Sequence, residues 1–215
     1  MHHKLNRQLC DELRTVPVVP VLTIENADSA VPLARALASG GLRILEVTLR
    51  TPAALEGLRR IAREVPEAMV GAGTVLKPEH GQDAIAAGAR FLVSPGITPS
   101  LVRAASMWTV PFLPGAATPS EVMALTDLGY CAAKFFPAEP MGGVAILKSF
   151  VAPLPNMLFC PTGGIGPANA PSYLALPNVV AIGGSWVAPS DAIAAGDWGT
   201  ITRLAHEASR LRALR

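Results

Sequence analysis

The sequence predicts a single-domain α/β protein of the (β/α)8 TIM-barrel class, and three observations support this prediction. Short apolar segments alternate with helical segments at a spacing of roughly 25 residues, which is typical of a parallel sheet. Half of the 215 residues are hydrophobic and only 16% are charged, as expected for strands that are buried on both faces. A chain of this length lies near the lower size limit for an eight-fold barrel.

Eight segments carry the short apolar pattern of buried strands. They are Val16–Leu22, Ile44–Leu49, Met69–Val75, Phe91–Pro95, Phe112–Pro114, Ala132–Phe136, Leu158–Pro161 and Val179–Ile182. A doubly wound open sheet is the main alternative. That fold usually places a glycine-rich phosphate site directly after its first strand, and residues 22–26 contain no glycine. The barrel is therefore the preferred arrangement.

Helical segments fill the spaces between these strands. Five of them are Ala30–Ala38, Ala53–Glu64, Glu79–Ala87, Ser100–Ser106 and Glu121–Leu128. Proline near the start and glycine after the end mark helix limits, as in the segment that begins at Thr118-Pro119 and stops at Gly129. No linker, low-complexity tract or shift in composition divides residues 1–215, so we expect a single domain.

The composition argues against several classes of partner. A net charge of +2 and an aromatic content of 5% do not suit nucleic-acid binding. The apolar runs are too short to cross a membrane, and no signal peptide is evident. Cys10, Cys131 and Cys160 show no CxxC or metal-ligand spacing, so we interpret them as reduced thiols of a cytoplasmic protein.

Polar residues gather near the predicted carboxyl ends of the strands, where barrel enzymes place their active sites. On the second strand Glu46, Thr48 and Arg50 share one face, because side chains of a strand alternate between its two sides. We expect this face to point into the mouth of the barrel. A partly buried Glu–Arg ion pair that serves the fold alone explains the same pattern.

Lys134 is the strongest single signal, since it is the one lysine of four that lies inside a predicted strand. Burying an ammonium group is costly, so such a lysine is either paired or held partly neutral by its surroundings. A neutral amine in an apolar pocket can form an imine with a ketone. The alternative is a lysine that extends to the barrel rim, or pairs with Glu46 for structure alone.

Glycine-rich segments follow the seventh and eighth predicted strands, at Thr162-Gly163-Gly164 and Gly183-Gly184-Ser185. Barrels often bind phosphate after these two strands, on backbone N–H groups. Tight turns alone would explain either glycine pair, but the two together predict a phosphate site.

No metal site is predicted. The four histidines, His2, His3, His80 and His206, avoid the predicted strand ends and show no HxH or HxxxH spacing. A catalytic metal would require several such ligands at those ends.

Six motifs lie in order near the predicted strand ends. They are Leu45-Glu46-Val47-Thr48-Leu49-Arg50-Thr51, Gly71-Ala72-Gly73-Thr74-Val75, Ser94-Pro95-Gly96, Lys134-Phe135-Phe136-Pro137-Ala138-Glu139, Cys160-Pro161-Thr162-Gly163-Gly164-Ile165 and Gly183-Gly184-Ser185-Trp186. Through them the chain resembles, along nearly its whole length, the 2-keto-3-deoxy-6-phosphogluconate and 4-hydroxy-2-oxoglutarate (KDPG/KHG) aldolases. The resemblance implies a homotrimeric (β/α)8 barrel of the Entner–Doudoroff pathway and a class I mechanism that needs no cofactor or metal.

The resemblance also implies roles for individual residues. Lys134 forms the imine with the C2 ketone of the substrate, and Glu46 is the general acid and base. Arg50 and Thr74 hold the carboxylate of the pyruvyl half. The remaining candidates line the substrate: Pro95 and Phe136 pack around the imine, and Thr162, Gly163, Gly164, Gly184 and Ser185 form the phosphate end. The implied reaction cleaves 2-dehydro-3-deoxy-6-phosphogluconate reversibly to pyruvate and glyceraldehyde 3-phosphate.

Two other functions stay open at this point. An aldolase of the same fold can prefer the galactonate epimer or unphosphorylated 4-hydroxy-2-oxoglutarate, with the discrimination at Thr162 and Ser185. A sugar-phosphate-binding barrel without aldol activity would need the glycine-rich ends but not a lysine and glutamate on strands. The loop residues Pro140 and Met141 and the segment 115–119 depart slightly from the family pattern and affect substrate preference at most.

Overall fold

The computed structural model describes residues 2–211, with side chains from Lys4 onward, so the side chains of His2 and His3 lie outside the described part. Strands and helices alternate along this range, and the strand pairs that it contains are parallel. The strands are β1 (Val18–Leu22), β2 (Ile44–Thr48), β3 (Met69–Gly73), β4 (Leu92–Val93), β5 (Phe112–Leu113), β6 (Gly115–Ala116), β7 (Ala132–Phe135), β8 (Leu158–Pro161) and β9 (Ile182–Gly184).

The strands form two parallel sheets. A six-stranded sheet has the order β5-β4-β3-β2-β1-β9, and a three-stranded sheet has the order β6-β7-β8. Strands β1 to β5 are therefore neighbours in the order in which the chain makes them. A doubly wound sheet reverses its strand order at a switch point, so the doubly wound alternative is wrong.

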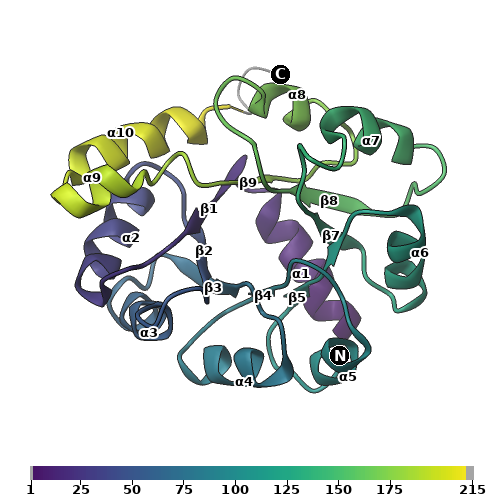
Figure 1. The fold of residues 1–215 in the computed structure, drawn as a ribbon, viewed down its shortest axis with the longest axis horizontal. Coiled ribbons are helices and arrows are strands. Elements are labelled where there is room, and N and C mark those ends of the chain that lie inside the picture. The colour runs from purple at the N-terminus through teal and green to yellow at the C-terminus, as the bar shows by residue number, and fades with distance from the viewer. Residues whose placement is uncertain (1, 212–215) are drawn as a thin grey trace.

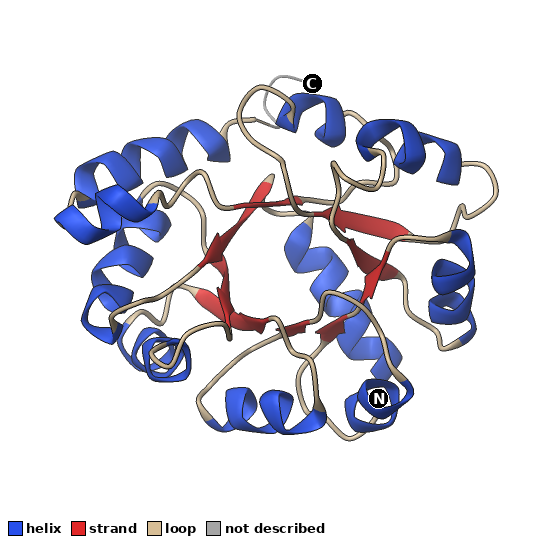
Figure 2. Ribbon diagram, viewed as in Figure 1, coloured by secondary structure: helices blue, strands red, loops and turns tan. Residues whose placement is uncertain are grey.

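The two sheets curl toward each other, and Figures 1 and 2 show their strands as a ring with helices on the outside. At one junction Pro114 separates β5 from β6, because proline has no N–H to donate to a ladder. Its carbonyl still accepts a hydrogen bond from Lys134 N at 2.8 Å. At the other junction, isolated bridges join Phe159 to Val179 and Thr162 to Gly183. A curled parallel α/β fold is thus confirmed, although its strands form two ladders instead of one eight-stranded ladder.

The helices cover the outside of the ring, except for α1. They are α1 (His2–Leu13), α2 (Ala30–Ser39), α3 (Ala54–Glu64), α4 (Pro78–Ala86), α5 (Pro99–Ala105), α6 (Pro119–Asp127), α7 (Gly143–Phe150), α8 (Ala170–Leu174), α9 (Ser190–Ala195) and α10 (Trp198–Ser209), with a short 3-10 helix at Ala27–Ser29. The five predicted helices agree with α2 to α6 within two residues at each end. Within residues 2–211, no helix combines the length and the apolar character needed to cross a membrane.

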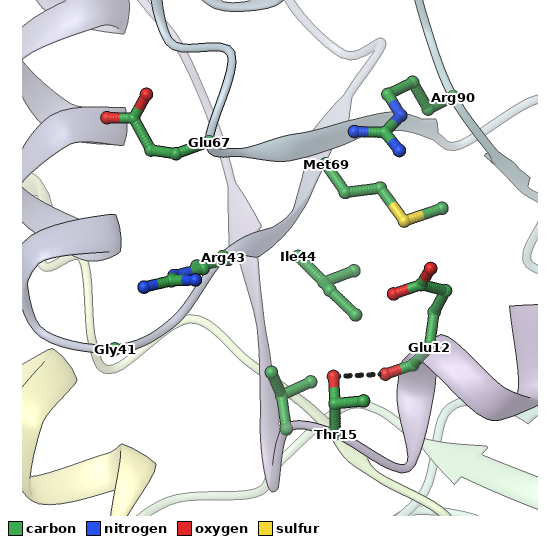
Figure 3. A pocket seen from close by; sticks show the side chains of 9 residues that line it. Glu12, Thr15, Gly41, Arg43, Ile44, Glu67, Met69 and Arg90 are labelled. Carbon is green, nitrogen blue, oxygen red and sulfur yellow. Dashed lines mark hydrogen bonds between the residues drawn. The ribbon is translucent and has the colours of Figure 1, made fainter.

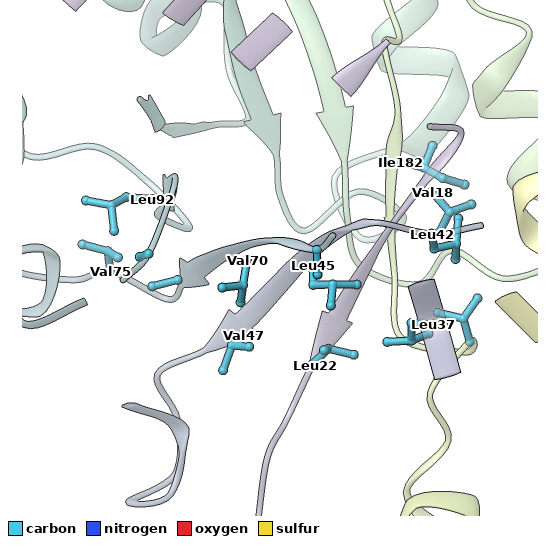
Figure 4. Close-up of a cluster of buried hydrophobic side chains, with 14 of the residues drawn as sticks. Val18, Leu22, Leu37, Leu42, Leu45, Val47, Val70, Val75, Leu92 and Ile182 are labelled. Atoms are coloured by element: carbon cyan, nitrogen blue, oxygen red, sulfur yellow. The ribbon is translucent and has the colours of Figure 1, made fainter. Parts of the chain in front are cut away.

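The outward faces of the strands pack against these helices. Leu45 and Val47 of β2 belong to the same buried apolar cluster as Leu37 of α2 and Ile182 of β9, and Figure 4 shows several members of this cluster. Strand alternation sends the residues between them to the other side of the sheet. The inward face of the ring is therefore separate from this outer core.

A second apolar cluster fills the inside of the ring at the amino ends of the strands. Ile44, Phe91 and Ala132 come from the strands or the residues before them, and Leu9 and Leu13 come from α1. In Figure 1, α1 is seen through the opening of the ring. Its contacts with this cluster place it across the amino end of the ring. The sequence analysis did not predict α1, because its apolar residues lie among charged ones and its partners are far away in sequence.

Six predicted strands extend one to three residues beyond the observed ones, and Leu158–Pro161 agrees. The third and the eighth show why the limits differ. The third was expected to reach Val75 but ends at Gly73, where Thr74 takes a positive φ of 60° that no strand accommodates. The eighth was expected at Val179–Ile182, but the strand lies at Ile182–Gly184. Val179 makes only an isolated bridge. The prediction placed the strand at the most apolar residues of this segment, whereas the residues that pair with β1 begin at Ile182.

We predict that Gly71→Ala destabilises the fold by about 1–3 kcal/mol, because the new methyl group overpacks the interior. A Cβ at position 71 would lie 2.5 Å from two atoms of the Phe91 ring. Urea unfolding at one protein concentration measures the loss. Gly166→Ala is the matched control, since a Cβ there meets no atom within 4 Å, and it should change stability by less than about 0.5 kcal/mol. Equal stabilities of the two variants would contradict this account of the interior.

Candidate active site

Lys134 and Glu46 meet inside the ring. Lys134 Nζ donates a hydrogen bond to Glu46 Oε1 at 2.8 Å, and the two side chains are only 4% and 5% exposed. The residues are 88 positions apart in sequence and belong to different sheets, β7 and β2. Their contact therefore crosses the interior of the ring, and Glu46 points inward as predicted.

Strand alternation explains why these charged groups point inward. On β7, Phe135 and Ala133 face the outer helices, while Ala132 packs in the interior cluster and Lys134 follows it on the same side. On β2, Glu46 follows Ile44 on the inner side in the same way. The apolar residues nearer the amino ends of the strands form a packed cluster. The ion pair lies next to this cluster, on the side of the carboxyl ends.

Two neighbours shape the space around the ion pair. A Cβ on Gly73 would lie 2.1 Å from Glu46 Oε1, so the absence of a side chain at this position leaves room for the carboxylate. The Phe136 ring lies on the other partner, with its centroid 5.4 Å from Lys134 Nζ. This distance is within the range of a cation–π contact. The ammonium group is therefore held between a carboxylate and an aromatic face.

The alternative that Glu46 pairs with Arg50 is wrong, because Glu46 takes Lys134 as its partner. Arg50, two residues beyond β2, donates instead from Nε to Thr74 Oγ1 at 3.1 Å. Thr74 follows β3 and has a φ of 60°. A β-branched residue in this conformation is strained, and such strain collects at ligand-binding positions. The two predicted carboxylate-binding residues are thus together at the carboxyl ends of adjacent strands.

The turn after β8 combines two left-handed glycines with a fixed backbone. Gly163 has a φ of 107° and Gly164 a φ of 77°. The carbonyl of Thr162 accepts from Ala138 N at 2.8 Å, and that of Gly163 accepts from Glu139 N at 3.1 Å. These bonds attach the turn to the segment that follows β7. The glycine pair is therefore positioned by the same stretch of chain that carries Lys134.

The glycines at the end of β9 lie beside this turn. Gly183 bridges to Thr162, and a Cβ on Gly183 would lie 2.1 Å from Thr162 Oγ1. A Cβ on Gly184 would lie 1.9 Å from the Trp186 ring, and Ser185 is exposed just beyond the strand. The two glycine-rich segments therefore meet at the carboxyl end, where Gly164 is exposed while Gly183 and Gly184 are covered by neighbouring side chains.

Glu139 and Tyr173 support the turn, and the sequence analysis did not find this pair. Tyr173 Oη donates to Glu139 Oε1, and burial together with this carboxylate raises the pKa of Tyr173. A Cβ on Gly164 would lie 2.7 Å from Glu139 Cβ, so Glu139 packs directly behind the glycine turn. The two residues are 34 positions apart, and no local pattern connects them.

Pro95 completes the predicted site on the side of β4. A Cβ on Gly115 would lie 2.2 Å from the Pro95 carbonyl oxygen, so a glycine at position 115 lets the two backbones touch. Just before it, Ser94 Oγ donates to the Gly96 carbonyl at 2.5 Å. The hydrogen bond and the close approach of Gly115 both constrain the turn after β4, in which Pro95 lies.

A cavity of about 420 Å³ lies at the opposite end of the ring. Arg43, Glu67 and Arg90 line it at the amino ends of the strands, with Glu12 and Thr15 at the end of α1, and Figure 3 shows Arg43 and Glu67 directed away from Ile44 and Met69. In barrel enzymes chemistry occurs at the carboxyl ends of strands, and the amino end serves stability. The buried Lys134–Glu46 pair, and not this cavity, is the candidate active site.

Comparisons with known proteins show the family to which this chain belongs. The family model of the KDPG and KHG aldolases matches residues 9–204. The KHG/KDPG aldolase of Escherichia coli K12 is 53% identical over 196 residues, which are 91% of this chain and 92% of that protein. The chain belongs to the KDPG and KHG aldolase family. The predicted family resemblance is confirmed.

Solved structures of family members have the same fold. The KDPG aldolase of Legionella pneumophila, with pyruvate captured at low pH as a covalent carbinolamine intermediate, gives a TM-score of 0.91 at 44% identity over 93% of this chain and 97% of that one. The 2-keto-3-deoxy-6-phosphogluconate aldolase of Zymomonas mobilis ZM4 with 3-phosphoglycerate gives a TM-score of 0.88 at 48% identity, covering 94% of this chain and 95% of that one.

Among the residues that the structure describes, no three His, Cys, Asp or Glu side chains gather closely enough to hold a metal ion.

We predict that Lys134→Met costs about 3–5 kcal/mol of stability, because it leaves the Glu46 carboxylate buried without its partner. Replacing both residues, as Lys134→Met with Glu46→Leu, should restore stability to within about 1 kcal/mol of the parent chain, since two apolar groups need no hydrogen bond. Urea unfolding of the two single variants and the double variant gives the coupling energy. A double variant that is less stable than the parent chain by clearly more than about 1 kcal/mol would show that the pair stabilises the fold on balance.

Proposed function

We propose that this chain is a metal-independent class I aldolase that cleaves 2-dehydro-3-deoxy-6-phosphogluconate reversibly to pyruvate and glyceraldehyde 3-phosphate. The observation that carries the proposal is the buried contact of Lys134 Nζ with Glu46 Oε1 at 2.8 Å. It combines an amine that can form an imine with a carboxylate within reach for proton transfer. The names of the relatives support the choice of substrate.

The first step is attack of Lys134 Nζ on the C2 ketone of the substrate. The amine must be neutral to attack, and Glu46 can take its proton through the existing hydrogen bond. The tetrahedral carbinolamine then loses its hydroxyl as water, for which Glu46 returns a proton. The carbinolamine of the Legionella relative supports this order of events.

Cleavage follows from the protonated imine. The C3–C4 bond breaks, and its electron pair moves toward the iminium nitrogen to form an enamine. The C4 hydroxyl loses its proton as the aldehyde forms, and Glu46 is the base that the geometry offers. Protonation of the enamine at C3 and hydrolysis of the imine then release pyruvate. No step requires a cofactor.

The remaining residues bind and orient the substrate. The paired Arg50 and Thr74 suit the carboxylate beside the reacting ketone, since a guanidinium donates parallel hydrogen bonds to a carboxylate. Phe136 and Pro95 pack around the imine and exclude water. The phosphate binds on Thr162 and Ser185 and the glycines 163, 164 and 184, where bare backbone lets a dianion approach N–H groups. Binding energy at this distant end then orients the reacting bond.

Aldolases of the same family with a different preference are the nearest alternative. They act faster on the galactonate epimer or on unphosphorylated 4-hydroxy-2-oxoglutarate. The paired glycine segments with Ser185 favour the phosphorylated substrate. Steady-state kinetics with the three substrates decides, and a higher kcat/KM for either alternative would replace the substrate proposed here. A binding protein without aldol activity is disfavoured, because a phosphate site alone does not require a costly buried Lys–Glu pair.

We also propose the domain organisation of the chain, its oligomeric state and its location. Residues 1–215 form one domain and one closed (β/α)8 barrel, for which the bridges between β8 and β9 and the continuity of chain through Pro114 are the support. The chain assembles as a homotrimer and works in the cytoplasm, in the Entner–Doudoroff pathway. The proposals of a trimer, of a cytoplasmic location and of the pathway rest on family membership.

Borohydride reduction in the presence of pyruvate should attach one reduced pyruvyl group to Lys134, because borohydride traps the imine as a stable amine. Peptide mass spectrometry locates the adduct. Lys148 on the outer helix α7 is the internal control and should stay unmodified. An adduct on another lysine, or none at all, would refute the Schiff-base role of Lys134.

Glu46→Gln should lower kcat by at least about 100-fold, because the amide cannot shuttle protons. The amide oxygen can still accept from Lys134 Nζ, so circular dichroism and the unfolding transition should remain near those of the parent chain. Turnover within a factor of three of the parent value would remove Glu46 from the mechanism.

A further inference from the structure

Two cysteines far apart in the sequence lie in contact at the amino end of the ring. Cys10 Sγ is 3.0 Å from Cys131 Sγ, although the residues are separated by 121 positions. Cys10 belongs to α1, and Cys131 directly precedes β7. Both are free thiols. The sequence analysis found no spacing that joins the cysteines and interpreted them as reduced thiols, because only the tertiary structure brings these two together.

We propose that Cys10 and Cys131 form a site of reversible oxidation by hydroperoxides, in which an intramolecular disulfide fastens α1 to the strand that carries Lys134. The two sulfur atoms need to approach by only about 1 Å to reach the disulfide bond length of about 2.05 Å. This site is independent of the aldol chemistry, which takes place at the opposite ends of the strands.

The two thiols differ in exposure, and the difference assigns their roles. Cys10 is 3% exposed and packs in the interior cluster with Leu13 and Ala132. Cys131 is only partly buried, so a small oxidant in solvent reaches Cys131 first. Cys131 is therefore the attacking thiol, and Cys10 is the thiol that resolves the product.

The electrostatics agree with these roles. The hydrogen bond with Cys10 lowers the pKa of Cys131 to about 7, and Arg7 of α1 and Arg14 just after it add to this effect against the opposing effect of burial. The same hydrogen bond and burial raise the pKa of Cys10. The thiolate, the form that attacks peroxides, is therefore favoured on the more exposed Cys131.

The chemistry balances in two steps. The Cys131 thiolate attacks one peroxide oxygen, so an S–O bond forms, the O–O bond breaks and the leaving hydroxide or alkoxide takes up a proton. This leaves a sulfenic acid on Cys131. Cys10 sulfur then displaces the hydroxyl, which leaves as water with the proton of the Cys10 thiol. Two thiols lose two electrons in total, and the peroxide gains them. A dithiol reductant reverses the reaction by exchange.

The disulfide should raise the thermal stability of the protein. It would close a loop between residues 10 and 131, which restricts the unfolded chain, and long loops gain most in this way. We expect the unfolding temperature to rise by at least about 5 °C. Helix α1 covers the interior cluster, so the disulfide would attach this helix covalently to the ring.

The experiment treats the reduced chain with a small molar excess of hydrogen peroxide and then blocks the remaining thiols. Non-reducing peptide mapping should find the Cys10–Cys131 disulfide, and thiol titration should fall from three per chain to one. Dithiothreitol should restore all three. In Cys160→Ala, the matched control, the titration should fall from two to none, and the unfolding temperature should rise as in the parent chain.

Cys131→Ala should keep its two remaining thiols under the same treatment and show no rise in unfolding temperature. If peroxide that fully oxidises free glutathione leaves the parent chain without the Cys10–Cys131 peptide, the pair is a packing contact only and the proposal fails. It also fails if Cys131→Ala loses thiols as fast as the parent chain. The peptide mapping uses the unaltered chain, so a poorly folding variant would not obscure the result.

Discussion

The buried ion pair of Lys134 with Glu46 is the constraint on which the interior of this protein depends. Two opposite charges in a dry interior lose hydration that their attraction only partly restores, so the surroundings must hold them in one geometry. Parallel strands from two sheets bring the pair together across the ring. Gly73 leaves space for the carboxylate, and the Phe136 ring covers the ammonium group.

The ring has two ends with different physical character. At the amino end, apolar side chains and α1 form a packed base, and this is where the neighbouring thiols of Cys10 and Cys131 lie. At the carboxyl end, glycine-rich turns lie beside polar side chains such as Arg50 and Thr74 and beside the Phe136 ring. The stable end fixes the strands, and the carboxyl end can therefore hold a strained residue such as Thr74 and an ion pair that contributes little to stability.

Local patterns predicted the order of the elements, the inward face of β2, the place of Lys134 within a strand, and the glycine-rich turns, because each depends on neighbours in sequence. They failed where contacts between residues far apart in sequence determine the structure. The strand near residue 180 was displaced toward its most apolar residues, and α1 was missed because its partners are strand residues from around the ring. The division of the ring into two ladders follows from pairing geometry at Pro114, which no periodicity reveals.

The sequence by itself determined the family, the alternation of strands and helices, and the presence of an inward lysine, glutamate and glycine-rich turns, since motifs and strand periodicity are local properties. Only the tertiary structure decided that Glu46 pairs with Lys134 and not with Arg50. The contact of Glu139 with Tyr173 behind the glycine turn likewise depends on the tertiary structure. The reason is that the contact partners lie tens of residues apart, and the curl of the sheets sets which inward groups meet.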